Sequence, residues 1–225
     1  MPTSIIPQGS SGASVEVGGT TFAALNVSPK PLDHGWFGHY SVGLSSGVMA
    51  AALGANTELV QFRWTDASRY CVIRKIRLSA SVSTTFFAAG VPWQVAMVKC
   101  HTWTAAGSGG TAAAILGGYK KRKNMGASLV LAGDIRVAST AGLTAGTKVL
   151  DGAPMQAIVA PCPTAAPNGT MVEPDTVFWQ SEGHDGEHRF VLHQNEGFVM
   201  RNVAIQALGV WQFRVQIDWS ELPRY

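Results

Sequence analysis

The amino-acid sequence predicts an all-β protein built as a single β-sandwich. Three observations support this fold class: apolar and polar side chains alternate from Glu58 onward, no helical period competes in the clearest strand, and the composition can fill a large core. The chain has 225 residues, of which 46% are hydrophobic and only 14% are charged. A chain of this length fits one large domain.

The clearest strand lies near the end of the chain. Its large apolar residues recur at every second position and alternate with polar ones, and they are Trp211, Phe213, Val215, Ile217 and Trp219. Because successive side chains of a strand point to opposite faces, all five fall on one face. An α-helix would spread them around its circumference, so the pattern indicates a strand that crosses a whole sandwich.

The same alternation predicts further strands, over residues 58–65, 75–82, 93–101, 135–137 and 156–159. A turn is expected at Asp66–Ser68. Residues 189–193 and 198–202 flank Gln194–Gly197, and this arrangement predicts a β-hairpin in which Gly197 adopts a positive φ. The stretches 104–126 and 160–175 are longer than ordinary hairpin connections, which is typical of binding loops or disorder.

The first 55 residues differ from the rest because they are rich in proline, glycine and serine. We expect an extended N-terminal arm over residues 1–55, with short strands such as 20–25, followed by a sandwich domain over 56–225. Residues 45–55 fit a short helix or a loop. An aromatic cluster in this arm, Trp36, Phe37 and Tyr40, has two open interpretations. The rings either pin the arm to the sandwich or fill a pocket of a neighbouring subunit.

A second candidate interface is the basic run Lys120, Lys121, Arg122 and Lys123. These side chains either contact phosphates or an acidic patch on a partner, or form a solvated loop. The low charge of the whole chain favours extensive contact between subunits, because charged residues are depleted at interface centres.

Catalytic and metal-binding patterns are weak. His184, Asp185, Glu187, His188 and His193 are good metal-ligand types, but their spacing matches no zinc pattern, and a glycine-containing loop holds ligands poorly. The sequence contains no nucleophile elbow, phosphate-binding loop or dinucleotide fingerprint. We therefore expect no enzyme activity, no cofactor and no metal.

Charge and hydropathy exclude other classes. A net charge of +3 is too small to argue for nucleic acid. No apolar stretch reaches the roughly 18 residues of a membrane span, and the first residues do not resemble a secretory signal. Cys71, Cys100 and Cys162 have no paired spacing, which favours free, mostly buried thiols in a protein folded in a reducing cytoplasm.

Four stretches resemble virion structural proteins of tailed bacteriophages. They are Gln61–Ala80, Ala127–Met155, His188–Asn202 and Gly209–Glu221, and the similar region spans roughly Tyr40–Glu221. The resemblance implies a head-associated decoration (cement) protein with a jelly-roll-like sandwich, forming a homotrimer on the major capsid protein in the virion. The alternatives are another virion component, either the capsid lattice or a tail or fibre protein that binds receptors, and, from a different class, a metal-dependent enzyme using His184, His188 and His193.

Overall fold

The computed structural model describes residues 5–7, 14–18, 24–25, 38–50, 53–85, 92–114, 120, 126–160, 171–181, 189–204 and 209–223. Every regular element within these ranges is a β-strand and none is a helix, which confirms the predicted all-β sandwich. The chain divides into two compact units, Met1–Gly35 and Trp36–Tyr225. Within the described ranges, no helix is long and apolar enough to cross a membrane.

The first unit contains a small antiparallel sheet. Its order is β1-β2-β3, with β1 at Ile5–Pro7, β2 at Ser14–Gly18 and β3 at Ala24–Leu25. The predicted boundary at residue 55 is wrong, because β4 (His39–Ser45) pairs with the last strand of the sandwich. Tyr40 and Val42 on β4 are buried in the core. The prediction missed this strand because its outward positions carry serine and glycine and its apolar run is short.

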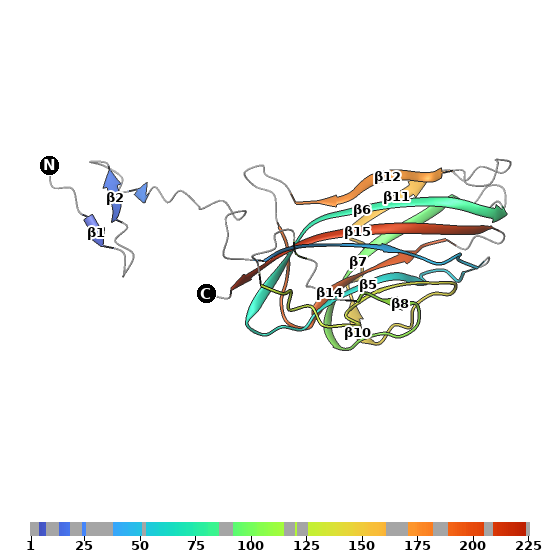
Figure 1. Ribbon diagram of the computed structural model, residues 1–225, viewed down its shortest axis with the longest axis horizontal. Coiled ribbons are helices and arrows are strands. Elements are labelled where there is room, and N and C mark those ends of the chain that lie inside the picture. Colours follow the sequence, from blue (N-terminus) through green and yellow to red (C-terminus); the bar gives the residue numbers. More distant parts are fainter. Residues whose placement is uncertain are drawn as a thin grey trace. The chain divides into compact units, whose positions relative to one another are not determined.

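The second unit is a sandwich of two antiparallel sheets (Figure 1). The five-stranded sheet has the order β12-β6-β15-β4, and β13 pairs with β6 beyond the end of β12. Besides β4, its strands are β6 (Arg69–Thr85), β12 (Met171–Gln180), β13 (Phe190–Leu192) and β15 (Val210–Pro223). The last strand of the chain therefore lies in the centre of this sheet, between β6 and β4.

The seven-stranded sheet has the order β10-β7-β14-β5-β9-β8, and β11 also pairs with β7. Its strands are β5 (Glu58–Trp64), β7 (Trp93–Ala105), β8 (Thr111–Ala112), β9 (Ile135–Val137), β10 (Thr147–Leu150), β11 (Gln156–Ala160) and β14 (Glu196–Asn202). Successive strands change sheet from β4 to β7, and again from β11 to β12, from β13 to β14 and from β14 to β15. Ser45 ends β4, and residues 46–50 and 53–55 form a loop, so the described part of the 45–55 stretch contains no helix.

Aromatic rings join the two sheets in the core. Phe62 of β5 stacks on Phe198 of β14, with ring centroids 5.4 Å apart. The same Phe62 meets Trp219 of β15 edge-on at 5.6 Å, so this contact crosses from one sheet to the other. Trp93 of β7 and Trp211 of β15 make a second edge-on contact at 5.6 Å. The predicted apolar face of β15 thus packs directly against the opposite sheet.

The predicted hairpin over residues 189–202 is wrong. β13 pairs with β6 in one sheet, whereas β14 pairs with β5 and β7 in the other. The residue with a positive φ in the connection is Asn195, at 61°. Gly197 is needed for space instead, since a Cβ there would lie 2.1 Å from the Phe62 carbonyl oxygen. The sequence pattern of a hairpin does not distinguish a turn within a sheet from a crossing between sheets.

We expect Trp219→Ala to lower the free energy of unfolding by about 3–5 kcal/mol, because it leaves a large cavity between the sheets. Gln212→Ala, at an exposed position of the same strand, should change it by less than about 0.5 kcal/mol. Urea unfolding followed by tryptophan fluorescence and circular dichroism measures both. Equal effects of the two substitutions would contradict the assignment of Trp219 to the core.

Candidate functional site

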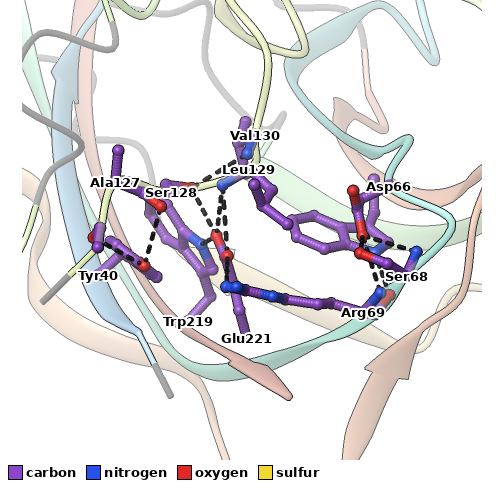
Figure 2. Close-up of polar contacts among 12 residues, drawn as sticks. Tyr40, Asp66, Ser68, Arg69, Ala127, Ser128, Leu129, Val130, Trp219 and Glu221 are labelled. Carbon is purple, nitrogen blue, oxygen red and sulfur yellow. Dashed lines mark hydrogen bonds and ion pairs between the residues drawn. The ribbon is translucent and has the colours of Figure 1, made fainter. Parts of the chain in front are cut away.

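The carboxylate of Glu221, near the C-terminal end of β15, is buried inside the sandwich and is 0% exposed. The Ser128 hydroxyl donates to its Oε1 at 2.6 Å, and the backbone N–H of Leu129 donates to the same oxygen at 3.1 Å. The indole N–H of Trp219 also donates to Oε1, at 3.3 Å. Figure 2 shows the carboxylate between the loop at Ser128–Leu129 and the side chain of Arg69. The core strand therefore holds a loop that lies about 90 positions away in sequence.

Arg69 gives this carboxylate its one ion pair among the described residues, with 3.4 Å between Nη1 and Oε2. The turn before β6 fixes Arg69: Asp66 Oδ1 accepts its backbone N–H at 2.8 Å, and the indole of Trp64 donates to its carbonyl at 2.9 Å. This turn lies where the sequence predicted it. The Arg69 side chain is 40% exposed, so water weakens its attraction to Glu221.

Burial is the largest influence on the pKa of Glu221 and raises it above the ordinary value of 4.5. The hydrogen bonds from Ser128, Leu129 and Trp219 and the charge of Arg69 act in the opposite direction. A buried carboxylate that accepts several hydrogen bonds remains costly to ionise when no fully buried cation faces it. The cluster therefore serves as an anchor whose strength depends on pH.

Tyr40, predicted either as core or as an interface anchor, lies in the core. Its ring stacks on Trp219 at 5.6 Å, and its hydroxyl donates to the carbonyls of Gly126 and Ala127 at 3.1 and 3.3 Å. Burial, with a smaller contribution from the charge of Glu221, raises the pKa of Tyr40 to about 12. The phenol therefore stays a neutral donor that ties β4 to the 126–127 loop. As a surface anchor for a partner, Tyr40 is excluded by its burial.

The two candidate interfaces of the sequence meet at one point, because Lys120 forms an isolated antiparallel bridge with Tyr40. Lys120 is exposed. Trp36, Phe37, Lys121, Arg122 and Lys123 lie outside the described residues, so their assignment to an interface stays a prediction.

The start of β4 is tied to the same cluster. The backbone N–H of Glu221 donates to the carbonyl of Gly38 at 3.0 Å. A Cβ at Gly38 would lie 1.8 Å from the Tyr40 hydroxyl oxygen, so a side chain here would displace the ring from its bonds with the loop. Gly38 thus allows the chain to enter the sandwich directly beside Glu221.

A second buried carboxylate, Glu58 at the start of β5, is paired with Lys148 of β10. The Lys148 ammonium lies 2.8 Å from Glu58 Oε2, and the two side chains are only 2% and 8% exposed. The amide of Gln61 donates to the same oxygen at 2.5 Å and to the Thr144 carbonyl at 2.7 Å. The ammonium also lies 4.5 Å from the ring centroid of Trp103, at cation–π distance. This pair ties the start of β10 to the start of β5.

The two described cysteines are buried, and His193 is exposed. Cys71 and Cys100 are free and buried, as predicted, and Cys162 lies outside the described residues. Burial raises the pKa of Cys100 to about 12 and that of Cys71 well above its usual range, so both thiols stay protonated. His193 is exposed and its ring lies 4.7 Å from that of Tyr70.

The possible metal-binding set is not brought together in the described part of the chain. His184, Asp185, Glu187 and His188 fall outside that part. Within it, no group of three or more histidine, cysteine, aspartate and glutamate side chains could hold a metal ion.

The sequence analysis missed Glu58 and Glu221, and a signal was present for Glu221, which continues the odd-numbered inward series that ends at Trp219. Glu58 has the parity of Val60 and Phe62 but bonds Gln61, which has the opposite parity, so alternation does not predict its contacts. A carboxylate that keeps the parity of an apolar face is expected to point inward and to need partners. The partners, Ser128 and Lys148, could not be read from that pattern.

Comparisons with protein-family models, with curated proteins and with solved structures found no match. The resemblance to phage virion proteins stays a prediction.

We expect Glu221→Gln to remove a pH dependence of stability. Because the folded pKa of Glu221 is raised, the native state holds this proton more tightly than the unfolded chain. Its contribution therefore lowers the unfolding free energy as the pH rises from about 4.5 through the folded pKa. Urea unfolding at pH 4 to 8 should show the wild type losing stability relative to Glu221→Gln over this window. Parallel pH profiles would contradict this assignment.

Lys148→Met should destabilise the fold by about 3–5 kcal/mol, because it leaves the buried Glu58 carboxylate without its cation. The double variant Glu58→Gln with Lys148→Met should recover most of this loss. Lys99→Met is the matched control, since Lys99 lies 3.9 Å from Glu196 in a more exposed pair and should cost less than about 1 kcal/mol. Additive effects in the double variant would show that Lys148 and Glu58 are not coupled.

Proposed function

We propose that this chain is a structural protein of a tailed-bacteriophage particle that binds the head shell as a decoration protein. The proposal begins with the resemblance of the four stretches between Gln61 and Glu221. Three of them supply the centre of the sandwich: β5 and β6, β13 and β14, and β15. The resemblance therefore falls on the elements that determine the fold. The partners in this proposal are the major capsid protein and further copies of this chain.

We infer further that the sandwich is a jelly roll. The order β4-β15-β6-β12 in one sheet and β5-β14-β7-β10 in the other supports this inference. So does the alternation of successive strands between the sheets, since a jelly roll joins two Greek keys across two packed sheets. β8 and β9 are then an addition in the long connection between β7 and β10.

The observation that carries the packing role is an apolar sheet edge. Among the described strands, β10 and β11 pair with β7 alone. They and the turn between them expose Val149, Met155 and Val159, at 49%, 36% and 61%. Exposed apolar side chains on an edge strand are a contact surface or an aggregation liability. We propose that this β10–β11 edge, defined by these three residues, contacts a neighbouring subunit.

The buried charges support the same role. The carboxylate oxygens of Glu221 and Glu58 accept hydrogen bonds and ion pairs from loops and strands of the same chain. Such contacts fix the shape of a surface without supplying a reaction. A separate N-terminal unit, Met1–Gly35, suits attachment to a neighbour by tethering.

The experiment is sedimentation of the full chain, alone and mixed with head shells of the same phage. We expect a trimer that co-sediments with shells. The double variant Val149→Lys with Val159→Lys should weaken self-association or shell binding at least tenfold, because it places two charges in the contact. Leu131→Lys, an equally exposed apolar position outside this edge, is the matched control and should behave as wild type. A stable monomer that never co-sediments with shells contradicts the proposal.

A further inference from the structure

The outward face of the five-stranded sheet carries two adjoining hollows, of about 240 and 470 Å³. Both are lined by Ser79 of β6 and Arg214 of β15, so they form one groove over the central strands. The larger hollow also contains Arg77, and the smaller one contains Gln212. Only 14% of the residues of this chain are charged, so two arginines lining the same hollow are a notable concentration of positive charge.

Strand register arranges the groove in two rows. In the first row Arg214 lies between Ser45 and Ser79, and in the second Gln216 lies between Gly43 and Arg77. Neighbouring strands are about 4.8 Å apart, and the rows are two residues, or roughly 7 Å, apart along the strands. The six positions therefore present two guanidinium groups, two hydroxyls and an amide within an area of roughly 10 by 7 Å.

The charge of the groove is positive. Arg77 Nη2 lies 3.0 Å from Asp175, and both side chains reach solvent, at 39% and 62% exposed, so a ligand anion can compete for the outer part of this guanidinium. Arg214 makes no ion pair within the described residues. In the next row Asp218 accepts a hydrogen bond from Gln216 at 3.3 Å and lies in register with Lys75. With that row included, three cations face two carboxylates, which leaves one net positive charge.

We propose that this groove binds an acidic oligosaccharide. Arginine pairs with carboxylate or sulfate through two parallel hydrogen bonds. Serine hydroxyls and glutamine amides both donate and accept, as the hydroxyl groups of a sugar require. Val177, paired in register with Arg77 and 41% exposed, adds an apolar surface for the C–H face of a ring.

Other ligand classes fit the groove less well. A peptide that binds beside a sheet uses apolar pockets or a free strand edge. This groove centres on β15 and β6, which are paired on both sides, and only its outer positions Gly43 and Ser45 lie on β4, which among the described strands pairs with β15 alone. Its two rows hold polar residues and glycine, so they form no apolar pocket for a peptide side chain. Single-stranded nucleic acid uses aromatic stacking platforms, and none of the groove rows described above contains an aromatic residue. The saccharide assignment does not depend on the proposed place in the virion.

Gly43 offers a direct test, because a Cβ at this position would meet nothing within 4 Å. Gly43→Phe therefore fills the groove without disturbing its neighbours. Gly152→Phe is the matched control, since Gly152 has the same open surroundings outside the groove. The probes are three tetrasaccharides that carry uronate, sialate or sulfate groups, titrated calorimetrically into the full chain. The carboxyl-reduced form of the uronate tetrasaccharide and a hexaglutamate peptide are the control ligands.

We expect at least one acidic tetrasaccharide to bind. Arg214→Gln and Gly43→Phe should each raise its Kd at least tenfold, and Gly152→Phe should change it less than twofold. If the uronate form binds, its carboxyl-reduced form should bind at least tenfold more weakly. Circular dichroism and urea midpoints verify that each variant is folded. Absence of binding by all three tetrasaccharides, unchanged binding by Gly43→Phe, or equally tight binding of hexaglutamate would overturn the proposal.

Discussion

The alternation of side chains along β15 is the constraint on which the rest of the sandwich depends. Its odd-numbered residues from Trp211 to Trp219 pack against the opposite sheet, and Trp219 reaches Phe62 across the core. Because β15 lies between β4 and β6, its register also fixes both neighbours. The same parity directs Glu221 inward, and it directs Arg214 and the other even-numbered residues up to Gln216 outward. A single sequence pattern thus places the core, the buried anchor and the polar groove.

Two of the buried carboxylates, Glu221 and Glu58, hold parts of the chain that follow β7. Glu221 holds the loop at Ser128–Leu129 in the connection between β7 and β10, and Glu58 holds β10 itself through Lys148. A buried ion pair adds little net stability compared with apolar packing, but removing one partner is costly. Its value here is geometric, because a polar contact with defined donors permits fewer loop conformations than apolar contact does. Two such contacts fix the positions of the Ser128–Leu129 loop and of the start of β10.

Local pattern predicted the elements, and long-range contacts decided the rest. β9 was predicted with its exact bounds, and β5, β7, β11 and β15 within a few residues, because each alternates over its own length. The hairpin at 189–202 and the boundary at 55 failed because they depend on which sheet a strand joins. For Glu221 the parity of β15 indicates burial, but Ser128 lies 93 positions away. No spacing rule connects two residues so far apart. The sequence could therefore indicate that Glu221 is buried, but it could not identify Ser128 as its partner.

The two faces of the five-stranded sheet have different roles, and the groove lies on the outer one. Its inner face supplies the stability of the fold through large apolar side chains, so the outer face is free to vary. A face that only had to meet water would favour threonine and other β-branched residues, which suit strands better than glycine or serine. Instead Gly43, Ser45 and Ser79 leave space beside Arg77 and Arg214. Three neighbouring strands that carry glycine and serine at these positions and two arginines beside the resulting hollow are better explained by a ligand than by solvation.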